Sequence, residues 1–417
     1  MNNMHQSLPS DDLVQKMFRE YYRKASFLVK EPSRIEEREF GFLLYRGGML
    51  RHKGFKRADE LQDFLRNFAP SHAYYSCAYY ENSEAEMDKK GWLGADLVFD
   101  IDADHIPTPC NKLHDKWLCG NCGFAGRGSL PERCPMCGSQ KFDVKTWPCE
   151  VCLESAKVET IKLLDMLMSE FGFSEKEIRV FFSGHRGYHV HVESEAVKTL
   201  DAVARKEIVD YVSGLGFDAV FHGLGERGWR TAHVLRGPNL NDCGWRGRVA
   251  KGVYDFILAA EEEDFKRVGL KKNVTGALLR SKDVILKSWE DTGPWSAVKG
   301  VGVETWKKIA GFCAKSQSAK VDTVVTTDIH RLIRLAGTLH GKTGLKKVEF
   351  PLSVIEDFDP FKSAVAFNKG TATVFVSDAP EFRLGDEVFG PYREQRVTLP
   401  TAAALLLICK GRAKVSE

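Results

Sequence analysis

The chain has 417 residues, of which 43% are hydrophobic and 28% charged, a composition typical of a soluble globular protein with room for more than one structural unit. Its 60 Lys and Arg residues nearly balance 57 Asp and Glu residues, so the net charge of +3 excludes a protein that is basic over its whole surface. The longest apolar run, 402–409, is too short to cross a membrane and no signal-peptide pattern is visible, so we expect a protein of the cytoplasm, or of the nucleus in a eukaryote, without membrane association.

The first hundred residues predict helices and strands in alternation. Apolar residues at helical spacing predict helices over 11–27 and 58–68. Between them, residues 38–51 surround a Gly-Gly turn and predict a β-hairpin. A Tyr-rich strand over 73–80 then leads to a strand over 97–103.

The strand over 97–103 carries two acidic residues among apolar ones. Side chains of a strand alternate between its faces, so Asp100 and Asp102 share one face and the apolar residues the other. Paired carboxylates suit divalent metal, and paired metal ions serve phosphoryl transfer in many polymerases. Taken alone, the pattern is a weak signal for metal, because an exposed strand edge can carry alternating acids for solubility.

Seven of the 11 cysteines fall within 110–152, and in a chain without an export signal this clustering favours metal binding over disulfides. An inner set has zinc-ribbon spacing: Cys119, Cys122, Cys134 and Cys137. An outer set completes a Cys₃His group: Cys110, His114, Cys149 and Cys152. A nested arrangement with two structural Zn²⁺ ions uses every ligand once. One zinc with spare thiols, or other partners between the sets, is the alternative.

Helices over 154–171 and 196–214 flank two predicted strands, 178–182 and 188–192. Residues 183–187 connect the two strands, and residues 188 and 189 are the first two of the second strand. Its small residues expose backbone N–H groups, and its Arg and His side chains donate to phosphate oxygens. An ordinary polar hairpin is the alternative explanation.

The last third combines a helical region with a turn-rich one. Residues 243–320 are polar and basic and predict a peripheral, mostly helical subdomain. Asp322 precedes a predicted short helix that includes 330–334, and a loop over 337–344 follows. Strands are predicted again over 346–351 and 372–376.

The motifs together resemble the catalytic (small) subunit of archaeal and eukaryotic-type DNA primase. The resemblance rests on their order along the chain: 38–40, 99–102, the Cys/His cluster, 183–189, then Asp322 with 331–340 and 384–391. Several separate motifs in a fixed order are more specific than any one of them.

The resemblance implies an α+β primase-polymerase fold: a mixed or antiparallel sheet flanked by helices within one catalytic domain, 1–417. The zinc-binding module, 110–152, is then an insertion with its inner ribbon at 119–137, and the outer cysteine set matches the family's structural zinc. The inner ribbon departs from the minimal family pattern.

The resemblance also implies the site residues. The catalytic ligands of Mg²⁺ or Mn²⁺ are Asp100, Asp102 and Asp322. The residues that hold the nucleoside triphosphate are Ser183, Arg186, His189, Arg334 and His340, with Glu39 and Arg51 near the initiating nucleotide.

The implied activity is template-directed, de novo synthesis of short primers on single-stranded DNA by two-metal nucleotidyl transfer. The implied partners are a large subunit that carries an iron–sulfur cluster, the single-stranded DNA template and nucleoside triphosphates. Two alternatives stay open: a repair-type primase-polymerase that extends primers or fills gaps, and a zinc-ribbon nucleic-acid-binding protein without activity.

Overall fold

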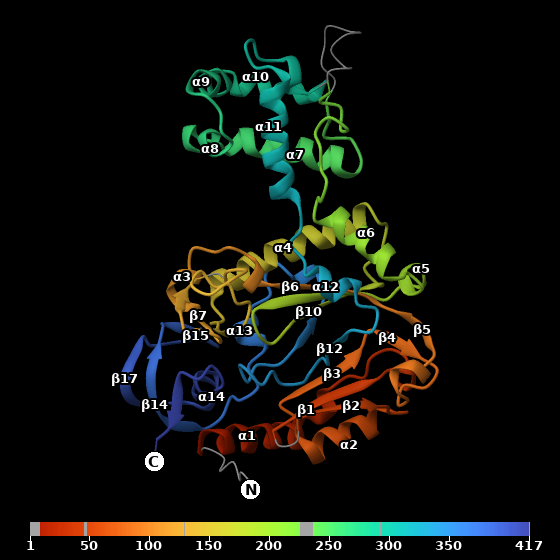
Figure 1. Ribbon diagram of the computed structural model, residues 1–417, viewed down its shortest axis with the longest axis vertical. Coiled ribbons are helices and arrows are strands. Elements are labelled where there is room, and N and C mark those ends of the chain that lie inside the picture. The colour runs from red at the N-terminus through yellow and green to blue at the C-terminus, as the bar shows by residue number, and fades with distance from the viewer. Residues whose placement is uncertain (1–8, 46–47, 129, 226–236, 292, 417) are drawn as a thin grey trace. The chain divides into compact units, whose positions relative to one another are not determined.

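The computed structural model describes residues 9–45, 48–128, 130–225, 237–291 and 293–416 (Figure 1). Contacts divide the chain into two compact units. The first consists of Met1–Ile161, Phe173–Lys206 and Val321–Glu417, and the second of Lys162–Gly172 and Glu207–Lys320. All the candidate catalytic residues and metal ligands named above belong to the first unit.

The first sheet of unit 1 has the order β12-β3-β1-β2 and is antiparallel throughout. Its strands are Leu332–Arg334, His72–Ser76, Phe40–Leu44 and Gly48–Lys53. The hairpin predicted over 38–51 is the pair β1–β2. Helices α1 (Pro9–Ala25) and α2 (Ala58–Phe68) contact each other, and Phe64 of α2 packs on Phe42 of β1 with ring centroids 4.4 Å apart.

The second sheet carries the acidic strand. Its order is β13-β10-β11-β6, again antiparallel throughout. The strands are Val348–Phe350, Ile178–Phe182, Gly187–Val192 and Leu97–Asp102. In β6 the side chains of Leu97, Phe99 and Ile101 are fully buried, while Asp100 and Asp102 keep partial exposure, as the alternation predicted.

Arg38 holds β6 against the first sheet. Its guanidinium is fully buried, pairs with Asp96 at 2.6 Å immediately before β6, and donates to the backbone carbonyls of Ser76 and Cys77. A buried charge is tolerated when it is paired and hydrogen-bonded in this way. The interaction fixes the acidic strand next to β3.

The cysteine-rich insertion lies between β6 and the long helix α4 (Glu150–Ser169). It consists of α3 (Asn111–His114) and a three-stranded antiparallel sheet in the order β8-β7-β9. The strands are Ala125–Arg127, Lys116–Cys119 and Phe142–Lys145. This small sheet is called the ribbon sheet below.

The C-terminal part of unit 1 forms a third sheet, β17-β14-β18, made of Tyr392–Pro400, Thr371–Ala379 and Ala413–Val415. The apolar run at 402–409 is the buried helix α14 (Thr401–Cys409). Within the described residues, no helix is both long and apolar enough to cross a membrane. Smaller elements complete the unit: β4 (Ala78–Tyr80), β5 (Trp92–Ala95), α5 (Glu195–Lys198), α12 (Thr323–Thr327), α13 (Pro360–Ser363), β15 (Phe382–Leu384) and β16 (Glu387–Phe389).

Unit 2 is helical. Its helices include α7 (Gly244–Ala259), α8 (Glu262–Arg267), α9 (Lys272–Arg280), α10 (Lys282–Lys287) and α11 (Val303–Gln317). Three tryptophans form its aromatic core: the ring centroids of Trp289 and Trp306 lie 5.6 and 5.4 Å from that of Trp295. Helices α7 to α11 lie within the predicted range 243–320, while the compact unit that contains them begins at Glu207 and also includes Lys162–Gly172.

The predicted α+β class with antiparallel sheets is confirmed, but two predicted helices are wrong in detail. The helix over 196–214 is two helices, α5 and α6 (Ala202–Val212), because the Asp201 carboxylate accepts from the N–H of Ala204 and starts a new helix. Residues 330–334 are not helical. Instead, the Asp328 carboxylate caps a turn by accepting from the N–H of His330, and the chain continues as β12 along β3.

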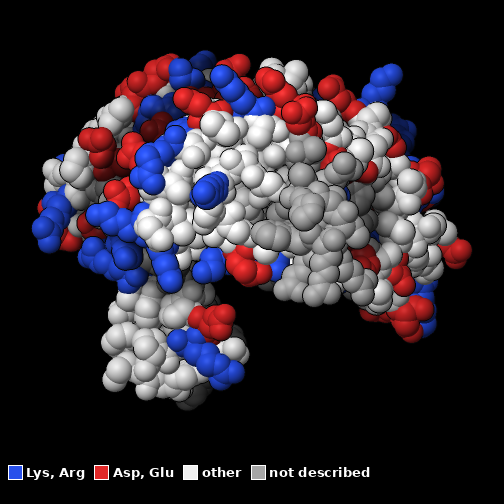
Figure 2. Space-filling view, turned by 90° about the horizontal axis from the view of Figure 1, so that it is seen from above, with Lys and Arg blue, Asp and Glu red and all other residues white. Residues whose placement is uncertain are grey.

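Figure 2 shows acidic and basic side chains intermixed over one face of the molecule. This distribution agrees with the small net charge, so functional charge has to be found in local clusters.

Candidate active site and cysteine clusters

Three acidic residues meet at the end of β6. Asp100 and Asp102 come from the strand itself, and Asp322 is the N-cap of α12, where its carboxylate accepts from the N–H of Val324 at 2.8 Å. The backbone N–H of Asp322 donates to the carbonyl of Asp100 at 2.9 Å. The structure thus brings together acidic residues that are far apart in the chain.

The surroundings of Asp100 disfavour its ionised form. Burial, together with the charges of Asp102 and Asp322, raises the pKa of Asp100 to about 7. Opposite Asp100 in the strand register stands His189 of β11, whose Nε2 lies 3.6 Å from an Asp100 carboxylate oxygen. Crowded carboxylates of this kind are stabilised by a divalent cation, which favours their ionised form.

The turn between β10 and β11 is pinned by its own serine. The Ser183 hydroxyl accepts from the backbone N–H groups of His185 at 3.2 Å and Gly187 at 3.3 Å. The His185 ring stacks on the His340 ring, with centroids 4.9 Å apart and planes 8° apart. Two motifs separated in the sequence, 183–189 and 337–344, therefore form one surface.

Five basic side chains gather around this surface, and they are called the cationic pocket below: His185, Arg334, His340, Lys347 and Lys410. Lys410 Nζ lies 3.0 Å from His185 Nε2, and Lys347 Nζ donates to the carbonyl of Arg334 at 2.8 Å. Burial and the neighbouring positive charges hold the pKa values of His185 and His340 well below the usual histidine range. Burial and the charge of Arg186 lower the pKa of Lys410 to about 8. The positive charge of this group therefore comes from Arg334 and the lysines and not from the histidines, and a bound anion relieves the repulsion between those charges.

Arg186 takes a different position from the other residues predicted to bind triphosphate. Its side chain is fully buried and forms ion pairs with Asp104 and, at 3.1 Å, with Asp115. It also donates to the Cys152 sulfur at 3.3 Å. Arg186 therefore connects the 183–187 turn to the outer cysteine set.

Glu39 and Arg51 are brought together on the first sheet. Glu39 is fully buried, accepts from Arg51 Nε at 2.9 Å and lies 3.4 Å from Lys90 Nζ. Among the described residues, no hydrogen bond or ion pair joins Glu39 or Arg51 to the three acidic residues at β6.

The outer Cys/His set converges as its spacing predicted. Cys110 Sγ lies 3.6 Å from Cys149 Sγ and 3.4 Å from Cys152 Sγ, and His114 Nε2 lies 3.6 Å from Cys152 Sγ. All four ligand atoms lie within 4.8 Å of one another. A tetrahedral Zn²⁺ with bonds of about 2.3 Å spaces its ligand atoms by about 3.8 Å. The donor set and its spacing fit this ion.

The inner set also converges. Cys119 Sγ is 3.6 Å from Cys137 Sγ and Cys122 Sγ is 3.7 Å from Cys134 Sγ, with all four sulfurs within 4.8 Å of one another. Each knuckle ends on a glycine with positive φ, of which Gly123 has φ 73°. The inner and outer cysteine sets therefore form two separate groups of four ligands, which is the nested arrangement predicted from the sequence.

Comparison with known proteins decides the family. Residues 142–352 match the family described as DNA primase small subunit. The chain belongs to this family. Three relatives carry the name DNA primase small subunit PriS. The one from Methanothrix thermoacetophila is 34% identical over 96% of this chain and 98% of its own length. Those from Methanococcoides burtonii and Nitrosopumilus maritimus are 35% and 30% identical, over 96% and 97% of this chain and 97% and 98% of their own lengths.

The resemblance inferred from the order of motifs is confirmed by these matches. Four residues of the site were not predicted: Asp115, His185, Lys347 and Lys410. Asp115 carries a recognisable signal, since a carboxylate next to a histidine ligand commonly orients its ring. Nothing in the sequence around Lys347 or Lys410 indicates a site, because tertiary contacts alone place them there.

Proposed function

We propose that this chain is the catalytic subunit of a DNA primase, which synthesises short primers de novo on single-stranded DNA by template-directed nucleotidyl transfer. The observation that carries the proposal is the convergence of three acidic residues at β6 beside a buried cationic pocket. Family membership supports this activity over a repair-type primase-polymerase and over an inactive zinc-ribbon protein.

The metal-binding role is assigned to Asp100, Asp102 and Asp322. Carboxylate oxygens are the ligands that Mg²⁺ and Mn²⁺ prefer, and burial together with the charges of Asp102 and Asp322 raises the pKa of Asp100, an effect that a divalent cation would offset. Divalent ions bound here supply activation of the attacking 3′-hydroxyl and stabilisation of charge on the α-phosphate and pyrophosphate.

The triphosphate is assigned to the cationic pocket and the 183–189 segment. Arg334 and His340 donate to its oxygens, and His189 holds a phosphate oxygen beside Asp100. Ser183 shapes the turn through its two backbone hydrogen bonds. Arg186 positions the turn from its buried side. Holding the reacting groups in line supplies much of the rate enhancement in such a reaction.

Both cysteine sets are assigned structural Zn²⁺. Four protein ligands fill a tetrahedral zinc and leave no position for water or substrate, so neither ion takes part in the reaction. Glu39 and Arg51 are assigned to the initiating nucleotide. The large subunit with its iron–sulfur cluster, the single-stranded template and the nucleoside triphosphates are the proposed partners, and the cytoplasm is the proposed compartment.

The decisive experiment compares Asp100→Asn with Asp63→Asn, which changes an exposed carboxylate of α2 in the same unit. Incorporation of labelled nucleotide is measured on unprimed and on primed single-stranded DNA. Asp100→Asn is expected to lose at least about 10²–10³-fold in rate, the scale found when charge stabilisation at a reacting centre is removed, with zinc content unchanged. Asp63→Asn retains activity. Full activity of Asp100→Asn contradicts the proposal, and synthesis on primed templates alone favours the repair-type enzyme.

A further inference from the structure

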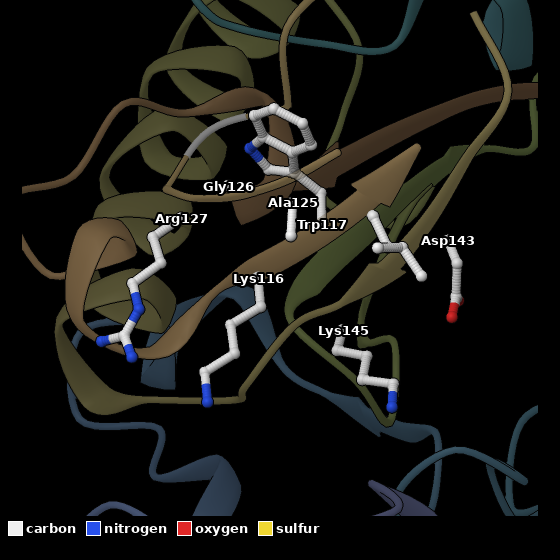
Figure 3. Close-up of a pocket in the computed structure, with 8 residues that line it drawn as sticks. Lys116, Trp117, Ala125, Gly126, Arg127, Asp143 and Lys145 are labelled. Carbon is white, nitrogen blue, oxygen red and sulfur yellow. The ribbon is translucent and has the colours of Figure 1, made fainter. Parts of the chain in front are cut away.

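The ribbon sheet places three cations side by side. In its register Lys116 of β7 stands opposite Arg127 of β8 on one side and opposite Lys145 of β9 on the other. Directly opposed residues of antiparallel strands point to the same face, and strands are about 4.8 Å apart, so the row spans about 10 Å. Figure 3 shows the three side chains extending to one side of the sheet, with the indole of Trp117 on the other.

Like charges directly opposite each other destabilise a sheet, so the row needs an explanation. Lys116 is neutralised by Asp378 at 2.9 Å. Arg127 and Lys145 are exposed, and neither forms an ion pair with any described residue. Two positive charges, one on each side of Lys116, therefore have no ion-pair partner among the described residues.

The row lies beside two cavities that share two of its residues. One cavity, of about 360 Å³, covers the face of the ribbon sheet. A second, of about 350 Å³, shares Lys116 and Arg127 with it and extends to Tyr392 and Arg393 at the start of β17. Together they are called the ribbon trough. Its described lining includes five Lys or Arg residues and two Asp residues, so it is strongly positive in a protein of net charge +3.

The trough has the two features of a site for single-stranded nucleic acid. Cations follow its length, where they neutralise phosphates, and the half-buried Tyr392 and half-exposed Leu118 offer flat or apolar surface to unstacked bases. It also begins next to the active site: Lys116 directly follows Asp115, whose carboxylate is 3.1 Å from Arg186 of the 183–187 turn.

We propose that the ribbon trough binds the sugar-phosphate backbone of single-stranded DNA, and that this is the role of the inner cysteine ribbon. The proposal rests on the proposed primase function for its choice of DNA strand. The inner ribbon then serves as the support that fixes the three strands, and hence the cation row, in register.

The test uses the full, zinc-loaded chain and a fluorescein-labelled deoxythymidine oligonucleotide of about 20 nucleotides, with binding followed by anisotropy between about 50 and 200 mM salt. The variant Arg127→Ala/Lys145→Ala removes the two unpaired cations. The matched control, Arg133→Ala/Lys141→Ala, removes the same charge from exposed positions of the same insertion that do not line the trough.

Each phosphate contact with a single strand contributes about 0.7 to the slope of log affinity against log salt. The trough variant is therefore expected to bind about 20-fold more weakly at about 0.1 M salt, with a slope reduced by about 1.4. The control is expected to change neither quantity, and both variants keep their zinc. An unchanged slope in the trough variant, or an equal loss in the control, overturns the proposal. So does a loss confined to binding of the large subunit, which makes the trough a protein interface.

The failure of this inference is distinguishable from failure of the proposed function. Asp100→Asn removes the proposed catalysis but leaves the trough intact, so it is expected to bind the oligonucleotide like the wild-type chain. A wild-type chain that binds through the trough yet makes no primer contradicts the proposed function alone. A chain that makes primers while the trough variant binds normally contradicts the trough alone.

Discussion

Replacement of Asp115 by asparagine is expected to weaken both the fold and the outer metal cluster. The carboxylate is only 4% exposed and accepts three hydrogen bonds or ion pairs. Its partners are His114 Nδ1 at 2.7 Å, the Trp147 N–H at 3.0 Å and Arg186 Nη2 at 3.1 Å. Although burial opposes ionisation, the hydrogen bond from His114 and the charge of Arg186 hold the pKa of Asp115 below its usual value.

The Asp115→Asn side chain has the same shape as aspartate but no charge. Its NH₂ group replaces one acceptor oxygen, so a donor now faces either the donor of His114 or that of Arg186. Loss of a buried hydrogen bond to a charged group costs about 1.5–3 kcal/mol. At about 2 kcal/mol, the ratio of unfolded to folded protein rises about 30-fold. Because Asp115 also orients the His114 ring, zinc affinity of the outer set is expected to fall about 10- to 100-fold.

Urea unfolding of the zinc-loaded chain measures the first effect, and zinc competition with a chromophoric chelator measures the second. Asp63→Asn is the matched control, since its carboxylate is 61% exposed and exposed ion pairs contribute about 0–1 kcal/mol. An Asp115→Asn chain with unchanged unfolding midpoint and unchanged zinc affinity refutes the reasoning. A change in unfolding alone refutes the part that concerns His114.

Three further outcomes are expected. Gly187→Ala places a Cβ 2.0 Å from a backbone oxygen of β6, so it is expected to separate β11 from the acidic strand and to reduce the rate of primer synthesis about 10²-fold. Gly311→Ala in α11, where a Cβ meets no other atom, is expected to leave the rate unchanged. Equal rates of primer synthesis in the two variants contradict this. The pKa of Lys410 is lowered to about 8, so between pH 8 and about 10.5 the unfolded state binds more protons than the folded state and the free energy of unfolding rises with pH. Lys410→Met is expected to remove about 2 kcal/mol of that rise, measured by urea unfolding at pH 8 and at about pH 10.5. An equal rise in the variant and the wild-type chain contradicts this. Cys149→Ser, in the outer set, is expected to lose one zinc equivalent and to raise the KM for nucleotide. Cys137→Ser, in the inner set, is expected to lose one zinc equivalent and to weaken only DNA binding. Identical defects in the two variants contradict separate roles for the two cysteine sets.

The sequence was informative where local pattern decides structure. The alternation along β6 predicted the burial of Leu97, Phe99 and Ile101 and the partial exposure of the two aspartates, although Val98 on the acidic face is buried as well. The cysteine spacing predicted two convergent sets. Both depend on residues that are near one another in the chain, where strand periodicity and the geometry of a knuckle constrain the result. The approach of Asp322 to Asp100 was implied by family resemblance, because no local pattern determines a contact across two hundred residues.

Tertiary contacts account for what was missed. Arg334 was expected on a helix, but its segment pairs with the free edge of β3, and sheet pairing outweighs local propensity in such a short element. Arg186 carries the pattern of an exposed phosphate ligand, yet Asp104 and Asp115 draw it into the interior. Arg186, Asp104 and Asp115 come into contact only when the cysteine-rich insertion folds against the second sheet, so their ion pairs cannot be read from the sequence.

The order of segments in unit 1 has a consequence for biosynthesis. β6 and the outer cysteine set are made early, but Asp322 and the basic residues Arg334, His340, Lys347 and Lys410 are made only after the whole helical unit, Glu207–Lys320. On the ribosome, the acidic strand emerges long before its counter-charges and its third carboxylate. Pairings between such distant segments form slowly, so the acidic strand stays without these partners during that interval, and an interrupted translation product lacks the third carboxylate of the candidate site.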